Sequence, residues 1–126
     1  MIEFKDLLYE IDDVLSQSLC EDIIFRFNND PDVEKGRTMG GYDPNTKLSY
    51  DLHLPKVIDR WRDIDQTLYE SIGNNLKFYC NHLEKLYPIS SDSIIGSNHV
   101  DWGYMIKSYS SHHGHYSWHQ DEEHYE

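Results

Sequence analysis

Two residues near the end of the chain, His119 and Asp121, have the types and the spacing of a metal-ligand pair. A single residue, Gln120, separates them, so on a β-strand both side chains would leave the same face. An imidazole and a carboxylate on one face can share a divalent transition metal. The pair would supply two of the three protein ligands of a two-histidine, one-carboxylate iron site.

The His-x-Asp pattern by itself is a weak signal in this chain. With 8 histidines among 126 residues, the pattern is expected about once by chance. It occurs a second time, at His99 and Asp101. The surroundings of the two pairs must therefore decide between them.

The surroundings of His119 resemble those of the metal motif in the Fe(II)- and 2-oxoglutarate-dependent dioxygenases, in their prolyl-4-hydroxylase-like branch. Those proteins carry a strand that ends in a tyrosine, then a glycine-containing turn, an aromatic residue and His-x-Asp. Here Tyr109 precedes His119 by ten residues, as in that family, and Gly114 lies in the turn. The aromatic residues are Tyr116 and Trp118.

The resemblance implies a role for each matching residue. His119 and Asp121 would bind Fe(II), and Tyr109 would donate a hydrogen bond to a carboxylate of 2-oxoglutarate. Tyr116 or Trp118 would border the substrate pocket. The enzyme would be a hydroxylase that uses O2 and converts 2-oxoglutarate to succinate and CO2. Its substrate would be a protein side chain or a small metabolite.

The same resemblance predicts an α+β fold, in which N-terminal helices lie on the first strands of a double-stranded β-helix, or jelly roll. The family's third ligand is a histidine far downstream of the motif, followed by an arginine or lysine that pairs with 2-oxoglutarate. Five residues follow Asp121. We therefore expect an incomplete barrel, a missing C-terminal half and little or no succinate formation by these residues alone.

The turn before the motif offers other ligand candidates. His112, His113 and His115 could bend toward a metal from the turn, whereas His124 would face away on a continuing strand. Lys107 would share a strand face with Tyr109 and could meet a carboxylate.

The chain is expected to form one domain, 1–126, because its length suits a single core. Residues 1–97 would form a helical support region with short strands, and 98–126 a hairpin that carries the motif. The expected elements, in chain order, are a strand at 7–11, a helix from Ser16 or Ser18 to about Asn28, a loop over 30–45, a strand at 48–54, a helix over 63–84, and strands at 102–109 and 115–121.

Two of these elements carry further predictions. Ser18 with Glu21 forms a capping-box pattern at the start of the first helix, with Ser16 as a rival cap. The alternation over 48–54 predicts a solvated face that carries Ser49, Asp51 and His53. The spacing of Asp51 and His53 also fits a metal pair, but the solvated face is the preferred interpretation.

The last two strands are expected to pair as an antiparallel hairpin across a short turn. Strand parity would place Ser117, His119 and Asp121 on one face. Tyr116 and Trp118 would lie on the other face, away from the metal, unless a bulge re-aims them.

Composition excludes several classes of partner. The net charge of −12 disfavours nucleic acid and anionic membrane surfaces, because no lysine or arginine cluster offsets the acidic field. No run of about 18 apolar residues predicts a membrane span. Cys20 and Cys80 are far apart and lack C-x-x-C spacing, which is typical of reduced thiols. We expect a cytoplasmic protein.

A non-enzymatic interpretation competes with the oxygenase. The chain could be an acidic binding domain whose histidine-rich tail, residues 112–124, captures a transition metal or titrates near neutral pH. In a third interpretation the histidines only fill a solvated turn.

Overall fold

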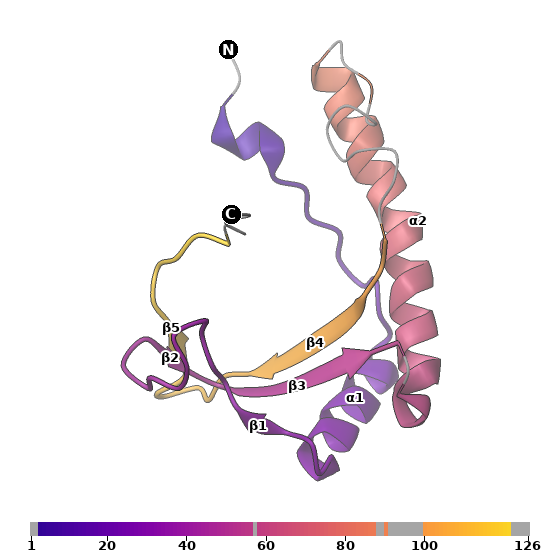
Figure 1. The fold of residues 1–126 in the computed structure, drawn as a ribbon. Coiled ribbons are helices and arrows are strands. Elements are labelled where there is room, and N and C mark those ends of the chain that lie inside the picture. Colours follow the sequence, from indigo (N-terminus) through magenta and orange to yellow (C-terminus); the bar gives the residue numbers. More distant parts are fainter. Residues whose placement is uncertain (1–2, 57, 88–89, 91–99, 122–126) are drawn as a thin grey trace. The chain divides into compact units, whose positions relative to one another are not determined.

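The computed structural model describes residues 3–56, 58–87, 90 and 100–121 (Figure 1). The described elements, in order, are η1 (Phe4–Leu7), α1 (Gln17–Asn29), β1 (Glu34–Lys35), β2 (Lys47–Leu48), β3 (Tyr50–Pro55), η2 (Asp59–Trp61), α2 (Arg62–Leu86), β4 (Gly103–Ser108) and β5 (His115–Tyr116). Helices and small antiparallel sheets together confirm the α+β class. Neither sheet of the described residues closes into a barrel.

The chain divides into two compact units. The first comprises Met1–Phe25 and Leu54–Tyr104, and the second comprises Arg26–His53 and Met105–Glu126. The expectation of a single domain stays a prediction. Every residue of the predicted motif from Tyr109 to Asp121 belongs to the second unit.

The two predicted helices are confirmed, with one correction at a cap. Ser16 Oγ accepts a hydrogen bond from the Leu19 amide at 3.2 Å, so Ser16 and not Ser18 caps α1. The Ser18–Glu21 capping box does not form, because the Glu21 carboxylate instead accepts from the Gln17 side chain at 2.8 Å.

The first unit is built around α2. The buried apolar side chains of this unit are Leu54, Trp61, Ile64 and Leu83. The N-terminal segment lies along the same helix, since the Tyr79 hydroxyl donates to the Leu7 carbonyl at 2.9 Å. The prediction of a strand at 7–11 is wrong: η1 and an extended segment occupy this part of the chain. The Asp6 and Leu7 carbonyls at the end of η1 contact the side chains of His82 and Tyr79 on α2 rather than a second strand.

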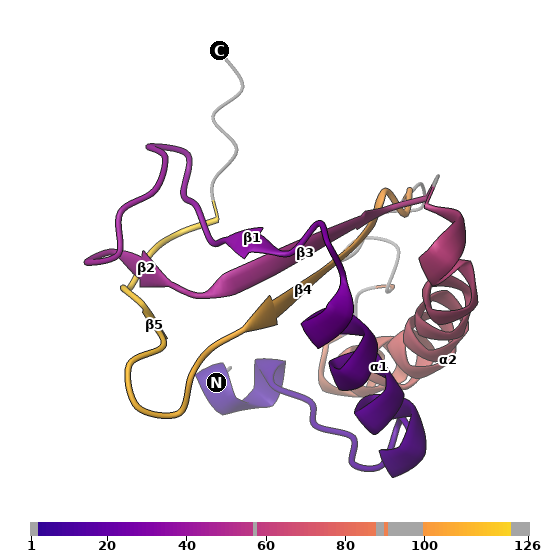
Figure 2. The same ribbon diagram turned by 90° about the horizontal axis from the view of Figure 1, so that it is seen from below.

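The sheets join segments that are distant in sequence. β3 lies between β1 and β4 in a three-stranded sheet, as Figures 1 and 2 show, and β2 pairs with β5 in a two-stranded sheet. The register places Lys47 opposite Tyr116 and Leu48 opposite His115. The predicted hairpin between the last two strands is therefore wrong. β3 holds Leu52 and Leu54, both almost fully buried, so pairing with β3 gives β4 a core strand as its neighbour.

The segment 48–54 also departs from the prediction. It forms two strands with a break at Ser49. Ser49 and Asp51 are buried, whereas Tyr50 is exposed, so the predicted solvated face is wrong at these positions. The polar side chains are buried because Lys47 supplies a matching charge from the same face.

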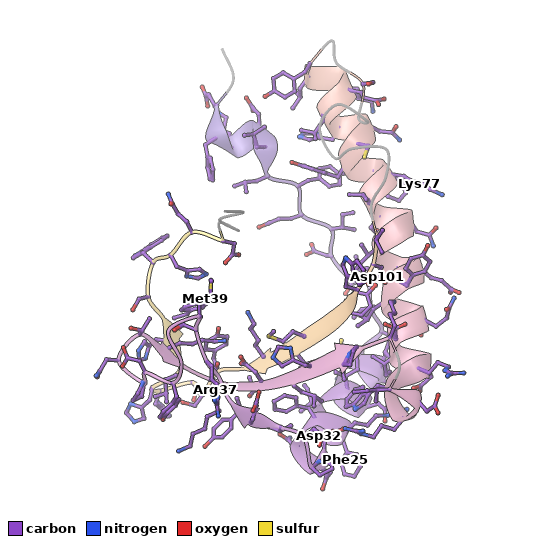
Figure 3. The ribbon with its side chains drawn as sticks, in the orientation of Figure 1. Phe25, Asp32, Arg37, Met39, Lys77 and Asp101 are labelled. Carbon is purple, nitrogen blue, oxygen red and sulfur yellow. The ribbon has the colours of Figure 1, made fainter. Side chains whose placement is uncertain are left out.

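The predicted loop over 30–45 is shorter than expected. It contains β1, and a β-bridge joins Thr38 to Gly41 across a tight turn. Met39 lies at this turn and is fully exposed; Figure 3 labels it together with Arg37.

Candidate functional site

The predicted metal ligands lie in a non-strand segment that follows β5. β5 ends at Tyr116, so residues 117–121 are not the strand that the sequence predicts. The Ser117 amide donates to the Thr46 carbonyl at 2.9 Å and makes the last backbone contact with the β2 side. Beyond it, the chain bends and brings His119 and Asp121 together.

The two side chains face one another. His119 Nε2 lies 3.4 Å from Asp121 Oδ1. The other ring nitrogen, Nδ1, lies 2.8 Å from the Ser117 carbonyl oxygen. A carbonyl can only accept, so Nδ1 carries the proton in this contact, and in the neutral ring Nε2 then keeps its lone pair.

The distance between the two side chains is compatible with an ion pair between a protonated imidazole and the carboxylate, and also with a metal ion shared by the two. A separation of 3.4 Å exceeds the ordinary hydrogen-bond range of about 2.7–3.2 Å. Two donors that each lie about 2.1 Å from one ion are separated by about 3.0–3.4 Å at octahedral to tetrahedral angles. A metal-binding histidine usually donates its second ring N–H to a carbonyl or carboxylate, as Nδ1 of His119 does.

Tyr116 contacts the site from an unexpected direction. Its ring stacks on the His119 ring, with centroids 3.7 Å apart and an interplanar angle of 19°. Strand parity predicts that Tyr116 lies on the opposite strand face from His119. This prediction is wrong because β5 ends at Tyr116, so His119 is not on the strand. Trp118 remains fully exposed.

Other predicted site residues are not drawn into the pair. Within residues 100–121, no hydrogen bond or ring contact joins Tyr109 to His119, and Tyr109 lies partly exposed just after β4. The rings of His112 and His113 are 6.4 Å apart in an exposed turn. In the part of the chain that the structure describes, no three histidine, cysteine, aspartate or glutamate side chains form a metal-binding group. His124 and His99 lie outside the described residues.

The turn between β4 and β5 depends on its glycine. The Gly114 amide donates to the Ser110 carbonyl at 3.0 Å. A Cβ at Gly114 would lie 2.5 Å from the Ser110 nitrogen and 2.7 Å from the Tyr109 Cβ. The glycine of the predicted motif is therefore required for a turn this tight.

Sequence reasoning missed a buried polar cluster beside this site. We call Lys47, Ser49 and Asp51 the buried cluster; each is at most 5% exposed. Lys47 Nζ lies 2.5 Å from Asp51 Oδ2, and Ser49 Oγ donates to Asp51 Oδ1 at 2.8 Å. Lys47 also contacts the Arg37 carbonyl at 3.4 Å. The three residues alternate along the chain, and this period-2 spacing is the signal that could have revealed the cluster.

A second charged cluster lies in the first unit. We call Lys56, Asp65 and Asp101 the junction cluster, since it joins the end of β3, α2 and the start of β4. The Lys56 ammonium bonds both Asp65 oxygens, at 2.8 and 2.9 Å, and forms an ion pair with Asp101. Figure 3 labels Asp101, whose carboxylate also accepts from the Gly103 amide at 2.8 Å.

The junction cluster alters the titration of its members. Partial burial opposes charging of Asp101, but hydrogen bonds from Lys56, Gly103 and Tyr104 outweigh it and lower the pKa of that carboxyl. Burial and the hydrogen bond to Asp101 raise the pKa of Tyr104 to about 12. Asp101 of the rival His-x-Asp pair is thus already held by a structural cation.

His115 connects the turn to the β2 side. Its Nδ1 lies 2.9 Å from the His113 carbonyl oxygen and its Nε2 3.1 Å from the Asn45 carbonyl oxygen. Both partners are acceptors, so the contacts favour the doubly protonated ring, and they raise the pKa of His115, the His113 contact most strongly. A ring held in this way has no lone pair for a metal.

No family model, curated protein or solved structure matches the chain. Among the described residues, no helix is long and apolar enough to span a bilayer.

Proposed function

We propose that residues 105–121 carry the His-x-Asp half of an Fe(II)- and 2-oxoglutarate-dependent oxygenase site, with His119 and Asp121 as iron ligands. The observation that supports this most strongly is the pairing of His119 Nε2 with Asp121 Oδ1 at 3.4 Å while Nδ1 bonds the Ser117 carbonyl. This combination supplies a free nitrogen donor, a carboxylate and a fixed tautomer.

The proposed enzyme is a hydroxylase whose substrate is a protein side chain or a small metabolite. When bound, Fe(II) would supply the activation of O2 and the oxidative decarboxylation of 2-oxoglutarate. The residues of this chain hold and orient the reactants. Tyr109 would donate a hydrogen bond from its hydroxyl to a 2-oxoglutarate carboxylate, and the strands would be the first of a double-stranded β-helix.

The overall charge supports a cation as the ligand. The net charge of −12 raises the local concentration of divalent cations around the protein. Asp121 is 96% exposed, and the His119 side chain is 38% exposed, so an ion can reach both donors directly from solvent.

Anaerobic calorimetric titration of the chain with Fe(II) tests the proposal. We expect one site whose binding is lost in His119→Ala. A His112→Ala/His113→Ala variant is the matched control, because it removes two exposed histidines of the same unit and leaves the pair intact. The proposal fails if His119→Ala binds Fe(II) normally and removal of His112, His113 and His115 abolishes binding. That result would favour a histidine-rich metal-binding turn.

A further inference from the structure

The buried cluster and the proposed metal ligand are connected by a continuous series of contacts. Lys47 on β2 lies directly opposite Tyr116 on β5. Its ammonium is 5.2 Å from the centre of the Tyr116 ring. The Tyr116 ring in turn stacks on His119. All three residues belong to the second unit.

The first part of this series is fixed by burial. Lys47 is 3% exposed, so it must stay paired, and Asp51 and the Arg37 carbonyl hold its ammonium in place. The cross-strand register then sets Tyr116 against that cation, where the face of an aromatic ring is attractive to it. Tyr116 is therefore constrained from the β2 side.

The second part fixes the imidazole. Residues 117–121 form no strand, and within the described residues the contact between the His119 ring and the backbone runs from Nδ1 to the Ser117 carbonyl oxygen. That bond leaves the ring free to rock about it. The stacked tyrosine, with its plane 19° from that of the imidazole, restricts this motion and keeps Nε2 directed at Asp121.

We infer that Tyr116, anchored by the Lys47–Asp51 pair, is the residue that positions His119 as a metal ligand. The inference rests on the proposed function, because it assigns to His119 the role of ligand. Tyr116 is then a positioning residue, and its contact with His119 replaces the strand that the sequence predicts at this point.

The test separates the ring from the rest of the tyrosine side chain. In Tyr116→Phe the stacking ring is kept, and in Tyr116→Leu it is removed. Tyr42→Leu is the matched control, since Tyr42 is an exposed tyrosine of the same unit that contacts Lys35. Two readouts are needed: the proton NMR shifts of the His119 ring, and the affinity for Co(II), used as an oxygen-stable probe of the Fe(II) site.

We expect the His119 ring protons to be shifted upfield by the stacked tyrosine, in contrast to those of His112. The upfield shift should persist in Tyr116→Phe and Tyr42→Leu and vanish in Tyr116→Leu. Loss of a residue that orients a metal ligand typically lowers affinity by about 10- to 100-fold. We therefore expect about a 10-fold weaker Co(II) affinity in Tyr116→Leu and an affinity within about twofold of the unmodified chain in Tyr116→Phe.

Two results would overturn the inference alone: unchanged His119 shifts in Tyr116→Leu, or lost shifts with unchanged Co(II) affinity. A different result, Co(II) binding by the unmodified chain that does not depend on His119, overturns the proposed function as well. The contribution of the Lys47–Asp51 pair to holding Tyr116 is tested with Lys47→Met/Asp51→Asn, which removes both charges together. If the His119 shifts in this double variant are those of the unmodified chain, Lys47 has no part in positioning.

Discussion

The buried cluster and the junction cluster both pair a lysine with carboxylates, but they differ in how far the charged groups are exposed to solvent. In the buried cluster, Lys47 and Asp51 are both almost fully removed from solvent. In the junction cluster, Lys56 keeps 35% of its side chain exposed and shares two carboxylates. Desolvation makes the first pair obligatory, because either charge alone would be buried without a partner. In the second, water can replace a lost partner. We therefore expect the two clusters to respond very differently to the same substitution.

The largest effect is expected from Lys47→Met. Among the described residues, the Ser49 hydroxyl is then the partner that remains for the buried Asp51 carboxylate. Breaking a buried ion pair in this way costs about 3–5 kcal/mol. Urea denaturation should show a correspondingly lower free energy of unfolding. The control is Lys47→Met/Asp51→Asn, which should recover most of the loss. Equal destabilisation by the single and double variants would show that burial of the charge is not the cause.

A smaller effect is expected where the backbone passes over the buried cluster. A Cβ at Gly36 would lie 2.1 Å from Ser49 Oγ and 3.1 Å from Asp51 Oδ1. Gly36→Ala must therefore displace the cluster, and overpacking of this kind costs about 1–3 kcal/mol. Gly40→Ala is the control, since the nearest atom to its new Cβ is 3.7 Å away. Thermal denaturation of both variants should separate them, and a matching loss in both would contradict the steric explanation.

The junction cluster should respond less, and its response should depend on salt. Lys56→Met removes the partner of Asp65 and Asp101, but these carboxylates are partly exposed and can be hydrated. The denaturation midpoint should fall by much less than in Lys47→Met. The difference in midpoint between Lys56→Met and the unmodified chain should become smaller in high salt. Lys77→Met is the control, because Lys77 lies on α2, the helix that carries Asp65; Figure 3 labels Lys77. A salt-independent loss as large as that of Lys47→Met would mean the clusters are equivalent.

The junction cluster also predicts a dependence on acid. The pKa of Asp101 is lower in the folded state than in an unfolded chain, so its contribution is fully present above the ordinary pKa of 3.8. It is lost as the pH falls through the lowered value. Denaturation curves between about pH 5 and pH 2 should therefore converge for the unmodified chain and Asp101→Asn. Parallel curves over this range would contradict the ion pair.

The smallest effect is a local one at the β2–β5 pair. The pKa of His115 is raised above its ordinary value of 6.5, so the two hydrogen bonds from its ring, which clamp the Asn45 and His113 carbonyls, are present at low pH. The clamp is lost as the pH rises through the raised value. Hydrogen exchange of the Ser117 amide, corrected for intrinsic rate, should lose protection over that range. His115→Gln should remove the dependence and His112→Gln should not.

The sequence predicts the helices and the central strands well, because their signals are local. The apolar period of α2 and the serine before α1 act within a few residues. Pairing partners are not local. β4 and β5 are adjacent in sequence and read as a hairpin, yet each pairs with a strand more than 40 residues away. The burial of Asp51 has one local and one more distant cause. Its partner Lys47 lies four residues away and could have been recognised from the spacing, whereas the backbone at Gly36 comes from another strand region.

The candidate site was predicted in its residue types but not in its geometry. The ten-residue spacing from Tyr109 distinguishes His119 and Asp121 from the rival pair, and in the structure their side chains lie 3.4 Å apart. A bend after β5 rather than a strand brings them together, so the parity argument placed Tyr116 on the wrong side. Where a strand ends depends on its partner, and β2 offers only two residues for pairing.

The most direct test of the account is a double-mutant cycle of Fe(II) affinity on His119→Ala and Asp121→Asn, measured under anaerobic conditions. If both residues bind one ion, each single variant should lose at least about 10-fold in affinity. The double variant should then lose little more than either single one, because the site is already broken. Additive losses, or an Asp121→Asn variant that binds as tightly as the unmodified chain, would contradict a shared ion.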